Sequence, residues 1–160
     1  MNPLEQGFPL TCFGLSAVGK GSNVGVTTKG ATANMQCPKC NSSMESVLFH
    51  DIEVDRCTKC KGIWFYEFTL DDLKAMKGSE AIDVGDPAVG KQQNKVGRIA
   101  CPVCGGTGKM LRMVDIKNPQ IWFECCHVCG GAYFDAGEFK HLKHETIADY
   151  FRNHFHKKRE

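Results

Sequence analysis

The chain has 160 residues, of which 42% are hydrophobic and 24% charged, and its formal net charge is +2. This composition excludes a disordered chain, and no apolar run approaches the roughly 18–20 residues of a membrane-spanning helix. The first residues lack a basic segment followed by an apolar one, so we predict a cytoplasmic protein. In that reducing compartment, cysteines bind metal or do chemistry far more often than they form disulfides, which excludes a disulfide-stapled secreted fold.

The segment 1–34 is rich in Gly, Ser and Thr and shows no persistent helical or strand period. We therefore expect a flexible tail, in which Cys12 is a free thiol. Met35 lies two residues before Cys37 and is a second candidate for the start of the protein.

Eight of the ten cysteines form an internal repeat of two copies. Each copy contains a Cys-Pro-x-Cys pair, a spacer and a Cys-x-x-Cys pair, followed by x-Gly-apolar-aromatic-Phe. The first copy uses Cys37, Cys40, Cys57 and Cys60, and the second uses Cys101, Cys104, Cys126 and Cys129. The repeat predicts two modules, at 35–78 and 99–143, with a polar linker at 79–98, a tail at 1–34 and an extension at 144–160.

Two cysteine pairs that a β-hairpin brings together supply the four soft ligands of a tetrahedral zinc ion. A module of about 40 residues also needs such a staple, because it buries too little surface to fold alone. Each turn should point backbone N–H groups at the sulfurs, and a residue behind the pair should relieve strained backbone. The residues placed for this role are Asn41, Gly62, Gly105 and Gly131. Four thiolates leave no open coordination position, so we predict two structural zinc ions and no catalytic residues.

Cys125 is expected to fill apolar space, because neighbouring strand residues point to opposite faces and Cys126 is the predicted ligand. A redox function is the alternative interpretation of a Cys-x-x-Cys pair. That function predicts a single pair beside a β-α-β pattern, whereas four pairs in two matched sets occur here. The spacing therefore favours metal binding.

Between its cysteine pairs, each copy shows the pattern of a β-hairpin. We expect strands at 44–49 and 51–55 in the first copy and at 110–114 and 121–124 in the second, with turns at 50–51 and 117–120. After each second pair, a short apolar strand and then a helix should follow.

The first helix should cover residues 70–77, with Thr69 and Asp72 as its N-terminal signal. The second should follow Asp135 and Glu138 and reach the end of the chain, because apolar residues recur at spacings of three, four and seven. These residues are Phe139, Leu142, Ile147, Tyr150, Phe151 and Phe155. The predicted fold class is a small metal-stabilised α+β protein of two tandem zinc ribbons, short β-hairpins each followed by a helix, with a long C-terminal helix.

Both copies resemble the transcription factor IIB-type zinc finger. The pattern of that family is C-P-x-C, a strand hairpin, then C-x-x-C-x-G-x-W-[LF]-D-x-G-E-[LF]. The second copy carries it nearly whole over residues 126–139, with Tyr133 in place of the tryptophan. The first copy keeps it over 57–65 but has Tyr66 and Thr69 in place of the acidic pair.

The resemblance covers residues 36–76 and 100–143 and implies a zinc-ribbon fold that binds zinc. It implies no reaction, because a fold does not determine a function. We find no Ser-His-Asp grouping and no open metal site in the sequence, so we do not expect an enzyme.

We predict instead a protein-interaction or adaptor module, which docks a partner or a second copy through the apolar helix beyond residue 143. Nucleic-acid binding in transcription regulation is the alternative, and a zinc-dependent redox or chaperone accessory is a third. Nucleic-acid binding would need a local basic patch, because thiolates bound to zinc make the net charge slightly negative. Four neighbouring aromatic residues are expected to form a small core beside the zinc rather than to stack on bases. They are Trp64, Phe65, Tyr66 and Phe68.

Overall fold

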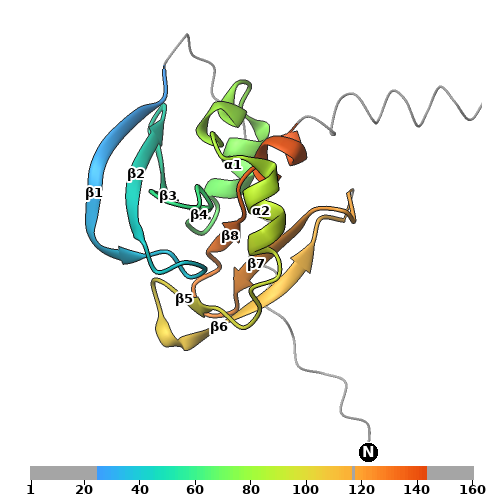
Figure 1. Cartoon of the computed structure of the whole chain (residues 1–160). Coiled ribbons are helices and arrows are strands. Elements are labelled where there is room, and N and C mark those ends of the chain that lie inside the picture. Colours follow the sequence, from blue (N-terminus) through green and yellow to red (C-terminus); the bar gives the residue numbers. More distant parts are fainter. Residues whose placement is uncertain (1–24, 117, 144–160) are drawn as a thin grey trace, which may run out of the picture.

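The computed structural model describes residues 25–116 and 118–143 (Figure 1). Its elements in chain order are β1 (Thr27–Gln36), β2 (Ser43–Phe49), β3 (Ile52–Cys57), β4 (Ile63–Phe65), α1 (Thr69–Ala75), the 3-10 helix η2 (Ser79–Ile82), α2 (Pro87–Gln93), β5 (Ala100–Cys101), β6 (Gly105–Val114), β7 (Trp122–Cys126) and β8 (Ala132–Phe134). Residues 138–143 are also helical. The predictions for Cys12 and for the helix at 144–160, with Ile147, Tyr150, Phe151 and Phe155, lie outside the described residues.

The strands form one antiparallel sheet in the order β1-β2-β3-β4-β8-β7-β6-β5. The first copy contributes β1 to β4 and the second contributes β5 to β8, so the two halves of the eight-stranded sheet meet at β4 and β8 (Figure 1). The predicted fold class is therefore wrong. The cysteine repeat belongs to one continuous sheet with only short helices in the described residues, and not to two tandem ribbons that end in a long helix.

The junction between the halves is centred on one pair of equivalent residues of the repeat, Trp64 and Tyr133. Trp64 faces Tyr133, and Ile63 faces Phe134, in antiparallel register. All six residues of β4 and β8 are buried. Each copy alone would leave this apolar strand as an unpaired sheet edge, so the pairing of the two edges explains why the copies join.

The predicted hairpins are present. In the first copy β2 pairs with β3 from Met44 opposite Cys57 to Phe49 opposite Ile52, and in the second β6 pairs with β7. The structure differs from the prediction on the N-terminal side of the first hairpin, where part of the predicted tail forms β1 and pairs with β2.

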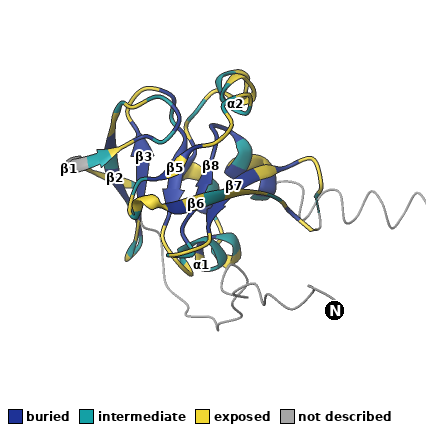
Figure 2. Ribbon diagram, turned by 90° about the horizontal axis from the view of Figure 1, so that it is seen from below, coloured by how far each residue is buried: buried dark blue, intermediate teal, exposed yellow. Residues whose placement is uncertain are grey.

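Two buried clusters lie on the sheet. One is an aromatic core in which the rings of Phe123 and Phe134 stack at 4.9 Å and Phe139 lies 4.9 Å from Phe65. The second contains the cysteine sulfurs with Trp64 and Tyr133. Figure 2 shows the buried strands at the centre, with α1 and α2 on opposite sides of them.

The segment 79–98, which the sequence predicts as a linker, contains η2 and α2. Its Asp83 is buried, and the two carboxylate oxygens accept hydrogen bonds from the backbone N–H groups of Gly137 (2.9 Å) and Lys140 (3.0 Å). Burial raises the pKa of Asp83. This carboxylate thus caps the helix at 138–143 and fixes the segment to the second copy.

The same helix also contacts the first copy. Lys143 Nζ donates to the backbone carbonyls of Leu73 (3.3 Å) and Lys74 (2.9 Å), near the C-terminal end of α1. An ammonium group at this end of a helix satisfies carbonyls that have no partner within the helix. The two halves are therefore held together by helix contacts as well as by the β4–β8 pair.

Candidate metal centres

The structure brings the four predicted ligands of the first copy together. The sulfurs of Cys37, Cys40, Cys57 and Cys60 all lie within 4.8 Å of one another. Cys37 Sγ lies 3.6 Å from Cys60 Sγ, and Cys40 Sγ lies 3.4 Å from Cys57 Sγ. A tetrahedron with Zn–S bonds of about 2.3 Å has edges of about 3.8 Å, so the sulfurs are spaced as zinc requires.

The second copy repeats this arrangement. Its sulfurs also lie within 4.8 Å of one another, and Cys101 Sγ is 3.6 Å from Cys129 Sγ. The other two ligands of this group are Cys104 and Cys126. In each copy the hairpin carries the second cysteine pair back beside the first, as the repeat predicts.

The backbone of the turns supports the sulfurs. Cys57 Sγ accepts from the N–H group of Cys60 at 3.3 Å, and Cys101 Sγ accepts from that of Cys104 at 3.3 Å. Such hydrogen bonds stabilise the thiolate form that binds metal. This local support confirms that the donor chemistry fits two structural zinc ions, each with four sulfurs and no remaining coordination position.

The residue that relieves the backbone is the one directly after each cysteine pair. These four residues have positive φ angles: 57° at Asn41, 62° at Lys61, 60° at Gly105 and 68° at Gly130. The prediction is therefore right at Asn41 and Gly105. It is wrong at Gly62 and Gly131, which lie one residue further along the chain.

Gly62 and Gly131 serve to admit an aromatic ring from the opposite copy. A Cβ atom at Gly62 would lie 2.0 Å from the hydroxyl of Tyr133, and one at Gly131 would lie 2.2 Å from Cζ2 of Trp64. Neither position tolerates a side chain while the ring stays in place. The glycine of each copy is thus needed for the packing of the other copy.

A buried ion-pair cluster lies beside the first metal centre. Lys39, between the ligands Cys37 and Cys40, has a side chain that is 0% exposed. Its Nζ lies 2.9 Å from Glu124 Oε1 and 3.1 Å from Asp135 Oδ2, both in the second copy. The sequence interpretation missed this lysine, because a charged residue in a turn is usually solvated; its place between two ligands is the only sequence signal.

Asp135 and Glu138 are the acidic pair of the family pattern, predicted to begin the second helix. Glu138 Oε2 accepts from the N–H group of Asp135 at 3.2 Å, as in a capping box. The Asp135 carboxylate binds Lys39 instead. Burial raises the pKa of Asp135 to about 6, although Lys39 opposes the shift, and burial raises the pKa of Glu138 to about 7.

Without metal, each sulfur group contains cysteines that hold their protons strongly, whereas hydrogen bonds lower the pKa of Cys60 and, against the effect of burial, that of Cys126. Burial raises the pKa of Cys101 to about 11. Hydrogen bonds with the sulfurs of Cys57 and Cys60 raise the pKa of Cys37, and burial adds to that shift. Zinc must displace these protons, so the affinity of each site for zinc rises with pH.

The two centres differ in exposure. Three of the four ligands are buried in the first centre, but only Cys101 and Cys126 are buried in the second. Cys125 lies in the aromatic core, away from the sulfur group. The second metal centre is therefore more accessible to solvent than the first.

Comparison with known proteins agrees with this chemistry. No curated protein and no solved structure matches the chain. Within the described residues, no helix has the length and apolar character that crossing a membrane requires. Residues 36–76 match the family model of the transcription factor zinc-finger. The segment 36–76 is thus similar to a zinc finger of the transcription-factor type, and the second four-cysteine group at 101–129 is consistent with a second copy.

Proposed function

We propose that the protein is a zinc-dependent binding module without catalytic activity, which docks a partner protein on a surface shared by both copies. The closed coordination of each zinc site supports the first half of this proposal, because four thiolates leave no place for a substrate or a reactive water on the metal. The second half depends on Phe68.

Phe68 occupies a position that folding does not explain. It is the N-cap of α1, has a φ of 68° and is 53% exposed. An L-residue in this left-handed conformation costs about 1–2 kcal/mol relative to glycine, and helix N-caps favour Ser, Thr, Asp or Asn. The predicted capping signal is also unused, since Thr69 Oγ1 donates to the carbonyl of Tyr66. A residue that breaks local rules without a folding benefit supports a binding role.

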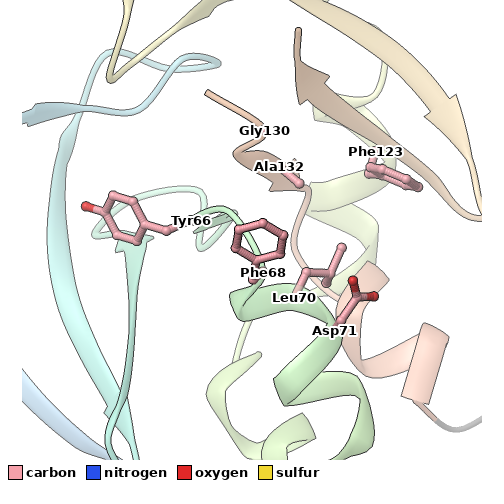
Figure 3. A pocket seen from close by; sticks show the side chains of 7 residues that line it. All are labelled: Tyr66, Phe68, Leu70, Asp71, Phe123, Gly130 and Ala132. Atoms are coloured by element: carbon pink, nitrogen blue, oxygen red, sulfur yellow. The ribbon is translucent and has the colours of Figure 1, made fainter. Parts of the chain in front are cut away.

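Phe68 borders a shallow hollow at the junction of the two copies (Figure 3). The hollow is lined by Tyr66, Phe68, Leu70, Asp71, Phe123, Gly130 and Ala132. The prediction that the four neighbouring aromatic residues form a core is right for Trp64 and Phe65 but wrong for Tyr66 and Phe68, which are exposed. Exposed aromatic rings around a hollow are typical of the anchor region of a protein interface.

Charge at the hollow favours a protein over a nucleic acid. Asp71 lines the hollow, and the side chain of Glu67 lies beside Gly130, another residue of the lining. Carboxylates repel a phosphate backbone, whereas they complement a basic residue beside an apolar anchor. The partner we propose is therefore an apolar protein segment that carries a lysine or an arginine.

One observation supports nucleic-acid binding as the second candidate. Trp122, on β7, is 43% exposed, and the guanidinium of Arg112 lies 5.6 Å from its ring. An exposed ring beside a cation can stack on an unpaired base. Arg112 also pairs with Glu124 at 3.4 Å, which reduces the charge that it offers to a phosphate.

The experiment compares two substitutions. Phe68→Asn suits both the left-handed backbone and the N-cap, so it should keep the fold while removing the anchor; Trp122→Ala is the matched control at the second candidate surface. The probes are a phage-displayed random peptide library and a labelled single-stranded oligothymidylate. We expect peptides selected on the wild type to contain apolar and basic residues, to be lost with Phe68→Asn and to be kept with Trp122→Ala. Oligonucleotide binding that only Trp122→Ala abolishes would overturn the proposal.

A further inference from the structure

A side chain of the second copy reaches the metal centre of the first. The hydroxyl of Tyr133 lies 3.1 Å from Cys37 Sγ and 3.5 Å from Cys60 Sγ. Tyr133 is 0% exposed, so water does not compete for this hydroxyl. The family resemblance places Tyr133 in the second copy only as an aromatic residue after Gly131, with no relation to the first group of ligands.

The sheet junction directs Tyr133 to this place. The residue faces Trp64 across the β4–β8 pair and lies with the sulfurs in one buried cluster. Gly62, two residues after the ligand Cys60, leaves the space that the phenol ring occupies. The approach of the hydroxyl is therefore a consequence of the joined sheet.

The buried thiolates of the first metal centre need hydrogen-bond donors. Four thiolates around one divalent ion carry excess negative charge, and burial makes such charge costly unless hydrogen bonds or cations compensate it. The first centre receives a hydrogen-bond donor from the second copy, the Tyr133 hydroxyl, and the first copy's own Lys39 lies beside it, held by Glu124 and Asp135 of the second copy. Lys39 Nζ lies 6.0 Å from the centroid of the Tyr133 ring.

The second centre does not receive the equivalent contact. Trp64 is the counterpart of Tyr133, and among the described residues its buried indole N–H has no hydrogen-bond partner. The donor from the opposite copy is thus specific to the first centre.

We propose that Tyr133 is a positioning residue of the first zinc site, whose hydroxyl donates its one proton to the Cys37 thiolate, with the Cys60 thiolate as a more distant acceptor, so that retention of zinc in the first copy depends on the folding of the second. The hydrogen bond withdraws electron density from the sulfurs and lowers their reactivity toward protons and oxidants. Loss of outer hydrogen bonds typically weakens metal binding by roughly 10–100-fold.

The test is Tyr133→Phe in the full-length protein loaded with two metal ions. The readout is the rate at which each ion passes to a chelator, with cadmium-113 NMR assigning each ion through the cysteine protons that couple to it. We expect release from the Cys37 group to accelerate by roughly 10-fold or more, with release from the Cys101 group unchanged. Tyr66→Phe is the matched control, since the Tyr66 hydroxyl donates to Asp55 Oδ2 at 2.5 Å and not to a sulfur.

Equal release rates in wild type and Tyr133→Phe would overturn the proposal, and so would equal acceleration at both sites, which indicates general loosening. A scalar coupling between the Tyr133 hydroxyl proton and the first-site cadmium reports the same bond in the wild type without any substitution. A protected hydroxyl proton with no such coupling would also overturn the proposal.

Discussion

Trp64 and Tyr133 occupy the same position in the two copies of the repeat and face each other across the β4–β8 pair. Each ring lies over the glycine that precedes the short strand of the opposite copy. The two residues therefore mark an approximate two-fold relationship between the halves. Because each half completes the packing around the cysteine turns of the other, we expect changes on either side of this junction to affect both.

Gly62→Ala tests the junction directly. The added methyl group would meet the hydroxyl of Tyr133 at 2.0 Å, so the ring must move or the strands must separate. We expect a loss of roughly 1–3 kcal/mol in the free energy of unfolding of the zinc-loaded protein, measured by denaturant titration. Gly106→Ala is the control, because a Cβ atom there meets nothing within 4 Å. Equal stability of the two variants would contradict the close packing of the junction.

The cysteine spacing was sufficient to predict both ligand sets, because each pair is local in sequence and one hairpin brings two pairs together. The joined sheet could not be predicted in the same way. The residues of β4 and β8 have the composition of a small core, and nothing in a three-residue apolar run distinguishes a core within one copy from an edge that pairs with another.

The role of Gly62 was missed for a related reason. A glycine near a metal-binding turn indicates relief of backbone strain, but its φ is not positive, and the space it leaves is visible only when Tyr133 is placed beside it. The position of Phe68 among other aromatic residues in the sequence predicts a place in the core. Its exposure follows from the turn into α1, which the sequence predicts with a different cap.

The pH dependence of stability should reveal the buried carboxylate of Glu138. Its pKa is about 7 in the folded chain against an ordinary value of 4.5, so between these values the folded state binds a proton that the unfolded state does not. The contribution of Glu138 to stability therefore falls as the pH rises through this window.

Glu138→Gln should remove that slope. Relative to the variant, the wild type should lose on the order of 2–3 kcal/mol of unfolding free energy between about pH 5 and pH 8, measured by denaturant titration with zinc present. Glu67→Gln, at an exposed carboxylate, is the control. A wild-type stability that changes with pH no differently from that of Glu138→Gln would show that Glu138 is ionised normally.

The unequal exposure of the two centres predicts an order of chemical modification. Cys104 and Cys129 are partly exposed, whereas Cys37 and Cys57 are 0% exposed. Thiolates that solvent reaches are alkylated and oxidised first. Brief treatment of the zinc-loaded protein with iodoacetamide, followed by peptide mass spectrometry, should modify Cys104 and Cys129 before Cys37 and Cys57. Modification in the reverse order would contradict the structure of the first centre.

Zinc K-edge X-ray absorption combined with metal analysis tests the two four-sulfur sites most directly. We expect two zinc ions per chain, each surrounded by four sulfurs at about 2.3 Å, from the cysteine groups at 37–60 and 101–129. A single zinc ion per chain, or an oxygen or nitrogen atom among the nearest neighbours of the metal, would contradict two closed structural sites.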